Sequence, residues 1–164
     1  MTLDPAAGCY CYERCSITAL AEMYKKILVA LENGPADKTL LPHVSELAGH
    51  FDCELLLVHV ADGWAARNFE KLQLAESEEM KEDRAYLEEK ASQLRQQGRR
   101  VSVHLALGDP ATEIVRTAKA EQCDLIAMTA HGHGFLKDLI FGSTINEVHH
   151  RSTIQILLLH SRTN

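Results

Sequence analysis

The sequence predicts an α/β fold built on a five-stranded, mostly parallel sheet with helices on both faces. Five short apolar runs alternate with segments whose apolar residues recur at helical spacing. The resulting order βαβαβαβαβ implies parallel strands joined by right-handed crossovers. In addition, the stretch from Thr129 to Thr144, TAHGHGFLKDLIFGST, follows one of the apolar runs. A strand that leads into a glycine loop and then a hydroxyl-bearing helix start is typical of phosphate binding.

The composition is that of an ordinary globular domain. The chain has 164 residues, 46% of them apolar, which suggests one domain with a substantial core. Its net charge of −6 argues against a nucleic-acid partner, which would need a basic face. The apolar runs are shorter than the roughly 20 residues that span a bilayer, and no signal peptide is recognisable. Together with five cysteines that fit a reducing compartment, this predicts a cytoplasmic protein without a membrane partner.

The first 22 residues differ from the rest of the chain. Cys9, Cys11 and Cys15 crowd there, but C-x-C-x3-C is not a usual zinc spacing, so incidental thiols are favoured over a metal site. Met23 stands directly before the first apolar run. We therefore expect residues 1–22 to be a poorly ordered extension and residues 23–162 to form the domain; whether the extension is an upstream start stays open.

The first half of the domain predicts two buried strands around a helix. Residues 27–31 and 55–60 are continuous apolar runs, as expected of strands covered on both faces. Turn residues follow the first run, and Asp37 is expected to cap the next helix, whose apolar face ends near Phe51. Cys53 and Cys123 each precede a predicted strand and are interpreted as small buried hydrophobic residues.

The second half continues the alternation. A long charged helix is predicted over about residues 76–97, with Gly98 suited to its C-terminal end. Pro110 fits the first turn of the next helix. The strands expected here are residues 101–107, which should lie nearer a sheet edge, 124–128 and 154–159. In a sheet of flavodoxin-like or related order, the loops after the first and fourth strands would meet at the ligand crevice.

Five segments, in order, resemble the universal stress protein domain: YKKILVALENG, LLLVHV, LGDPATEIV, CDLIAMTAHGHG and FGST. The resemblance covers roughly residues 24–160 and implies the Rossmann-like fold of the adenine nucleotide alpha hydrolases. The ATP-binding branch of that family carries G-x2-G-x9-G-[ST] after its fourth strand. Gly132, Gly142 and Ser143 match the last three elements of this pattern, whereas Thr129 stands at the first.

The resemblance also assigns a nucleotide site. Gly132, Gly142, Ser143 and Thr144 correspond to phosphate-binding positions, although the two hydroxyl residues can instead cap a helix, with Thr144 and Glu147 forming a capping box. Val60 and Met128 match positions that line the adenine pocket, against the alternative of plain core packing. His131 and His133, which flank Gly132, could add positive charge beside a bound polyphosphate or could equally be exposed loop residues, and a metal site is not favoured.

Two positions depart from the family pattern. The first strand ends in Ala30-Leu31-Glu32, where the family usually has an aspartate in place of Glu32 that hydrogen-bonds the nucleoside. Threonine at position 129 would be strained if the site needs positive φ there, and would narrow the pocket if the site needs only room. Gly134 would restore flexibility to the loop.

The resemblance therefore implies a regulatory switch in stress response. It would bind ATP, with or without Mg²⁺, or AMP or another adenylate. It would form a homodimer through the strand at residues 154–159, and with no recognisable catalytic set it would hydrolyse ATP slowly at most. One alternative is a dimeric stress protein that binds no nucleotide and acts through protein partners. Another is an enzyme of the adenine nucleotide alpha hydrolase type.

Overall fold

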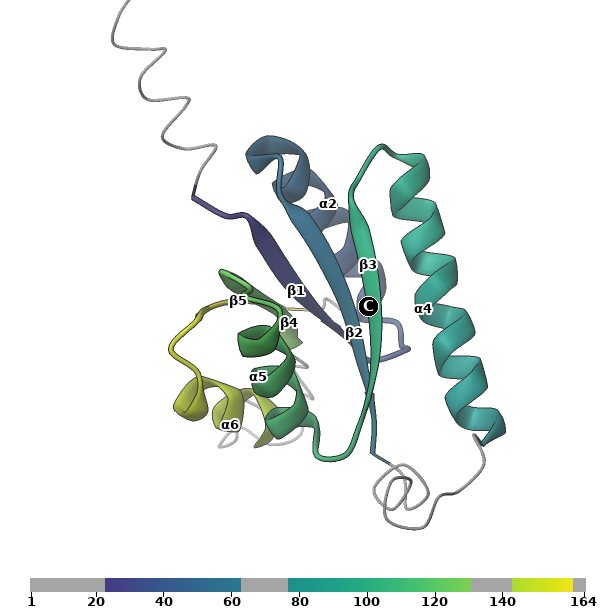
Figure 1. Cartoon of the computed structure of the whole chain (residues 1–164), viewed down its shortest axis with the longest axis vertical. Coiled ribbons are helices and arrows are strands. Elements are labelled where there is room, and N and C mark those ends of the chain that lie inside the picture. The colour runs from purple at the N-terminus through teal and green to yellow at the C-terminus, as the bar shows by residue number, and fades with distance from the viewer. Residues whose placement is uncertain (1–22, 63–76, 131–142, 161–164) are drawn as a thin grey trace, which may run out of the picture.

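The chain folds into one parallel sheet flanked by four helices in the described residues. The computed structural model describes residues 23–62, 77–130 and 143–160 (Figure 1). Within them, strands and helices alternate as β1 (Lys26–Leu31), α2 (Asp37–Phe51), β2 (Glu54–Ala61), α4 (Glu78–Gln96), β3 (Val101–Leu107), α5 (Pro110–Ala120), β4 (Leu125–Ala130), α6 (Ser143–Arg151) and β5 (Gln155–His160). The α/β fold predicted from the sequence is confirmed, and the predicted extension at residues 1–22 lies outside the described residues.

All the strand pairs are parallel, and the sheet order is β3-β2-β1-β4-β5. This is the doubly wound Rossmann-like order rather than that of flavodoxin. The chain moves in one direction along the sheet from β1 to β3 and in the other from β1 through β4 to β5, so strand order reverses between β1 and β4. That reversal opens a crevice beyond their carboxyl ends.

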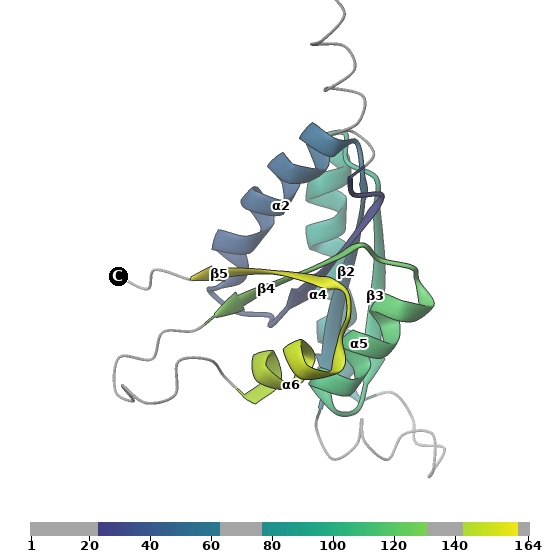
Figure 2. The same cartoon turned by 90° about the vertical axis from the view of Figure 1, so that its left-hand side faces the viewer.

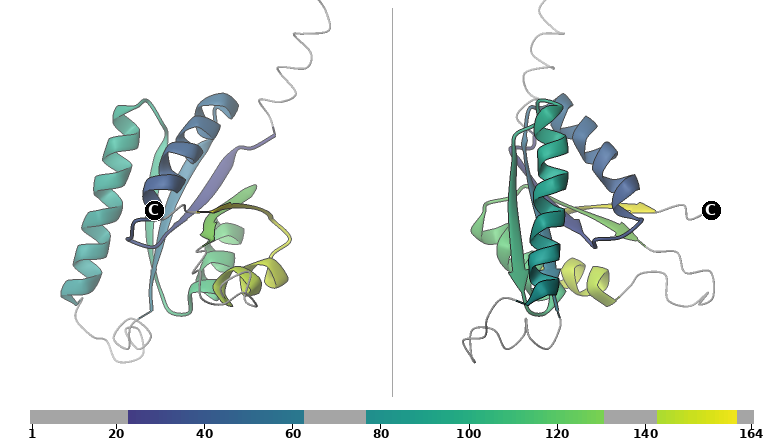
Figure 3. Two further views of the ribbon diagram at one scale, coloured as in Figure 1. Left: turned by 180° about the vertical axis from the view of Figure 1, so that it is seen from behind. Right: turned by 90° about the vertical axis from the view of Figure 1, so that its right-hand side faces the viewer.

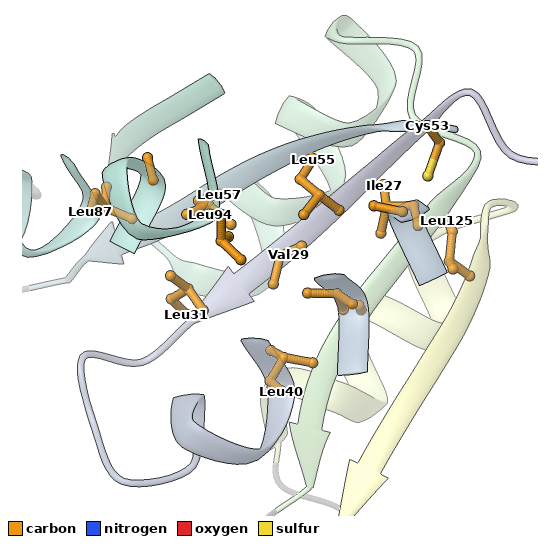
Figure 4. Close-up of a cluster of buried hydrophobic side chains, with 14 residues drawn as sticks. Ile27, Val29, Leu31, Leu40, Cys53, Leu55, Leu57, Leu87, Leu94 and Leu125 are labelled. Atoms are coloured by element: carbon orange, nitrogen blue, oxygen red, sulfur yellow. The ribbon is translucent and has the colours of Figure 1, made fainter. Parts of the chain in front are cut away.

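Two apolar layers, one on each face of the sheet, hold the fold together. Helices α2 and α4 cover one face side by side (Figure 3, left), and α5 and α6 cover the other (Figure 2). Figure 4 shows the first layer, where Val29 and Leu57 from the strands meet Leu40 of α2 and Leu87 of α4. Alternate residues of the same strands, such as Leu28 and Val58, pack in the second layer. Burial on both faces explains why these strands read as continuous apolar runs.

Two predicted helix starts need correction. Asp37 does not cap α2: Ala36 occupies that position and makes no side-chain cap bond, whereas Asp37 is buried as the first helical residue. Helix α6 begins at Ser143, so Thr144 lies inside the helix and the predicted capping box is wrong. In both places a hydroxyl or carboxylate near a helix start is compatible with several neighbouring donors, and the sequence does not say which one it meets.

Other local signals predict the structure correctly. Gly98 adopts φ +81° just after α4, the left-handed conformation that glycine supplies at a helix end. Pro110 occupies the first turn of α5, where Asp109 is the cap and accepts a hydrogen bond from the Thr112 amide. Just before β1, the ring of Tyr24 packs edge-on against that of Phe51 at the end of α2, with ring centroids 5.2 Å apart.

The two edge strands are only half buried. In β5, the four central residues are partly exposed although they are all apolar. The β3 strand is likewise mostly half buried, as expected for an edge. Among the described residues, no helix combines the length and apolar character that crossing a membrane requires.

The buried thiols provide a test of this packing. Cys53 and Cys123 are free and only 3% and 6% exposed, and burial raises the pKa of Cys123 to about 11. Because the thiolate is the reactive form, we expect both residues to resist iodoacetamide at pH 8 in the native protein and to react rapidly in denaturant. Peptide mass mapping measures both states. Equal labelling in the two states would contradict the packing described here.

Candidate functional site

A cavity of about 410 Å³ opens beyond the carboxyl ends of the central strands, at the point where strand order reverses. The ends of β1, β2 and β4 form its floor, and the starts of α5 and α6 form its sides. Its lining residues come from five elements and the turns that follow them: Ala30, Leu31, Glu32, Val58, His59, Val60, Asp62, Pro110, Ile114, Met128, Thr129, Thr144 and Ile145.

The lining is mostly apolar with a few polar groups at its rim. Val58 and Met128 are almost fully buried parts of the second core layer, and Val60 packs against that layer while remaining partly exposed. Glu32 and Asp62 are exposed and carry the acidic side chains of the rim. Apolar walls with a small number of placed polar groups are typical of small-molecule sites, and the volume falls within their usual range of roughly 300–1,000 Å³.

Most of the site residues predicted from the sequence do line this cavity. These are Ala30, Leu31, Glu32, Val60, Met128, Thr129 and Thr144. Ser143 opens α6 nearby but is exposed and is not part of the lining. Gly132, Gly134 and Gly142 lie outside the described residues, so their role in phosphate binding stays a prediction.

Sequence reasoning missed six lining residues. Val58 precedes Val60 by two positions and therefore faces the same side of β2, a signal that was available in the strand pattern. Pro110 and Ile114 lie one turn apart on α5, within the segment LGDPATEIV that carried part of the family resemblance. His59, Asp62 and Ile145 gave no sequence signal, because their placement depends on how the elements meet.

The two residues that depart from the family pattern meet each other. Thr129 Oγ1 donates a hydrogen bond of 3.3 Å to Glu32 Oε1, bridging the ends of β4 and β1. Thr129 lies within β4 and is 3% exposed, and its φ is not positive, so the predicted conformational strain does not arise. The longer glutamate and the hydroxyl of threonine thus form one contact at the rim of the cavity.

A second cavity, of about 790 Å³, lies between α2 and α4 on the opposite face of the sheet. Although it is larger, most of its polar groups bond to neighbouring residues of the chain. Tyr86 donates to Asp37, Ser45 donates to Gln97, and the amide of Gln93 donates to Glu89. The smaller cavity is therefore the better candidate for a ligand site, because it lies where strand order reverses.

Comparison with known proteins establishes the family. A model of the universal stress protein family matches residues 23–160. The chain belongs to this family. Universal stress protein MJ0577 of Methanocaldococcus jannaschii is 28% identical over 165 residues, covering 88% of this chain and all 100% of that protein. Its solved structure matches with a TM-score of 0.68 over 87% of this chain and 99% of that one.

Two further solved structures share the fold of this stress protein. One is a universal stress protein in complex with cAMP, with a TM-score of 0.64 and 17% identity, covering 84% of this chain and 97% of that one. The other is the universal stress protein from Archaeoglobus fulgidus in complex with dAMP, with a TM-score of 0.63 and 19% identity, covering 83% of this chain and 98% of that one.

The contact between Glu32 and Thr129 is testable by a double-mutant cycle. We expect Thr129→Val and Glu32→Ala to be coupled by about 0.5–1.5 kcal/mol in the free energy of unfolding, the range of a partly exposed hydrogen bond. Denaturant unfolding of the wild type, both single variants and the double variant measures the coupling. As a control, Thr144→Val should be additive with Glu32→Ala. Additivity of the first pair would show that the contact contributes nothing.

Proposed function

We propose that this universal stress protein binds ATP or a related adenine nucleotide at the smaller cavity and acts as a regulatory switch. The observation that carries the proposal is an apolar cavity of suitable size at the reversal point of the sheet, with Glu32 at its rim. The partly exposed side chain of Val60 offers apolar surface to a purine base, and the buried Val58 and Met128 complete the apolar wall. The carboxylate of Glu32, an acceptor, suits the hydroxyl groups of a ribose.

The phosphates would extend from this cavity toward α6. The N-terminus of a helix presents free amide groups and a positive dipole end, both of which favour an anion. Thr144, in the first turn of α6, already lines the cavity. Gly132, Gly142 and Ser143 would complete the phosphate site from the loop that follows β4, and Mg²⁺ would accompany a bound triphosphate.

The proposal assigns binding rather than catalysis to the site. The acidic groups at the rim are Glu32 and Asp62, and we assign Glu32 to the nucleoside. The sequence contains no recognisable catalytic set, so any hydrolysis would be slow. Nucleotide binding would instead change the loops around the cavity and, through them, the surface offered to protein partners. The existence of universal stress proteins in complex with cAMP and with dAMP supports an adenylate as the ligand.

A cavity-filling variant tests the proposal. We expect Val60→Phe to weaken ATP and AMP binding at least tenfold, since the larger ring occupies the space proposed for the base, while the melting temperature changes little. Isothermal titration calorimetry measures the affinity. Val101→Phe, on β3 outside the cavity, is the matched control and should bind as the wild type does.

Gly142→Ala should also abolish binding if a phosphate approaches that backbone. Failure of the wild-type protein to bind any adenylate at millimolar concentration would refute the proposal. The result would favour a stress protein that works through protein partners alone.

We also propose that the protein is a homodimer through β5. Within the described residues this edge strand pairs with β4 alone, and it carries four partly exposed apolar residues, Ile156, Leu157, Leu158 and Leu159. The outer backbone N–H and C=O groups of an edge strand can form hydrogen bonds with another strand. Pairing with the same strand of a second copy across a two-fold axis would cover it and leave no open end.

A charge placed on this strand should separate the two copies. We expect Leu159→Lys to convert the dimer to a monomer at micromolar concentration, because two lysines would be buried near each other across the axis. Gln155→Lys, at the exposed start of the same strand, should leave the dimer intact. Sedimentation velocity measures both variants. A wild-type protein that sediments as a monomer at about 100 µM would contradict the proposal, because that concentration is well above a typical micromolar dissociation constant.

A further inference from the structure

One short loop forms a wall shared by the two cavities. Leu31 and Glu32 line the smaller cavity, whereas Asn33, Gly34 and Asp37 line the larger one behind it. The loop therefore has the candidate nucleotide site on one side and helix α4 on the other. Glu32, one of the two acidic groups at the rim of the site, belongs to this loop.

The carboxylate of Asp37 organises this loop from within. It is 1% exposed and accepts three hydrogen bonds: from the amide of Glu32 at 3.1 Å, from the amide of Gly34 at 3.3 Å and from the hydroxyl of Tyr86 at 2.8 Å. A carboxylate removed from water needs such donors to offset its desolvation. Burial and the bond to Asp37 raise the pKa of Tyr86, so this hydroxyl stays a donor.

A second buried carboxylate, Asp83 of α4, bonds the same loop at Asn33, between the two amides that Asp37 holds. It is 7% exposed and accepts a 3.0 Å hydrogen bond from the side-chain amide of Asn33. Asn33 has φ 55°, the left-handed conformation that asparagine tolerates better than most residues. His59 Nε2 lies 3.4 Å from Asp83 Oδ2, and His59 Nδ1 donates to the Leu31 carbonyl at 2.8 Å. The residues on either side of Glu32 are therefore both connected to α4, Leu31 through His59 and Asn33 directly.

We propose that Asp83 and Tyr86 of helix α4 are positioning residues for the nucleotide site. They act through Asp37, Asn33 and His59 to fix the backbone on either side of Glu32. None of the four side chains Asp37, Asn33, Asp83 and Tyr86 lines the smaller cavity, so none would touch the ligand. Their effect on binding arises from the direction in which Glu32 presents its carboxylate. This inference rests on the proposed binding of an adenylate at that cavity.

Two mild variants each remove one hydrogen bond that helps to hold the loop. Tyr86→Phe removes only the hydroxyl that donates to Asp37. Asn33→Gly removes the amide that donates to Asp83 but keeps the left-handed backbone. We expect each to raise the dissociation constant of ATP about fivefold, because a loosened loop fixes the carboxylate of Glu32 less well. Lys90→Met is the matched control, because Lys90 contacts the ring of Tyr86 at 4.9 Å but not Asp37.

The decisive readout is the dependence on Glu32. If Tyr86 acts through this residue, Tyr86→Phe should not weaken ATP binding further in a Glu32→Ala background. An equal fivefold loss in both backgrounds would overturn the proposal, since it would point to a general loss of structure. Unchanged affinity in both single variants would overturn it as well.

Amide hydrogen exchange separates this inference from the proposed function. We expect the amides of Glu32 and Gly34 to exchange faster in Tyr86→Phe and Asn33→Gly than in the wild type and in Lys90→Met, with exchange elsewhere in β1 unchanged. If the wild-type protein binds no adenylate, the proposed function fails, and the exchange rates alone decide whether α4 positions the loop. Unchanged exchange in both variants would then refute it.

Discussion

The double-sided burial of β1 is the constraint on which the rest of the structure depends. This strand pairs with β2 on one side and β4 on the other, and five of its six residues are buried. A strand in this place cannot turn a polar face to solvent, so helices must cover both sides of the sheet. It also lies where strand order reverses, so its carboxyl end opens into the crevice between the two halves. The position of β1 in the sheet therefore determines both the two-sided core and the place of the candidate site.

Polar groups near that strand end are arranged around this constraint. Asp37, Asp83 and Thr129 are buried, and each has hydrogen-bond partners around the end of β1. Buried carboxylates are costly unless they are bonded, and both Asp37 and Asp83 accept hydrogen bonds from the loop after β1. In this protein they fix a loop of a few residues, and the acidic side chain of Glu32 extends from it toward the cavity. The surroundings of one rim group are therefore set by helices α2 and α4, on one face of the sheet, and by the end of β4.

Family membership accounts for the fold of this protein, whereas two residues at the rim of the cavity depart from the family pattern. Residues 23–160 belong to the universal stress protein family, and the fold agrees with solved members of that family. Yet the rim of the cavity contains a glutamate and a threonine at positions where the family pattern has aspartate and glycine. In this protein the two side chains are joined by a hydrogen bond of 3.3 Å.

The sequence by itself determined the fold class and most of the cavity floor. Apolar runs report burial, and their alternation with helical patterns is enough to predict a parallel sheet, while the resemblance to the family places Ala30, Val60 and Met128 at the site. It did not determine the partners of Asp37 or Thr144, because several donors lie within reach of a short polar side chain. Only the tertiary structure brought Asp83, Tyr86 and His59 to the loop that carries Glu32, and Thr129 to Glu32 itself. These residues are far apart in the chain, and local patterns contain no information about such contacts.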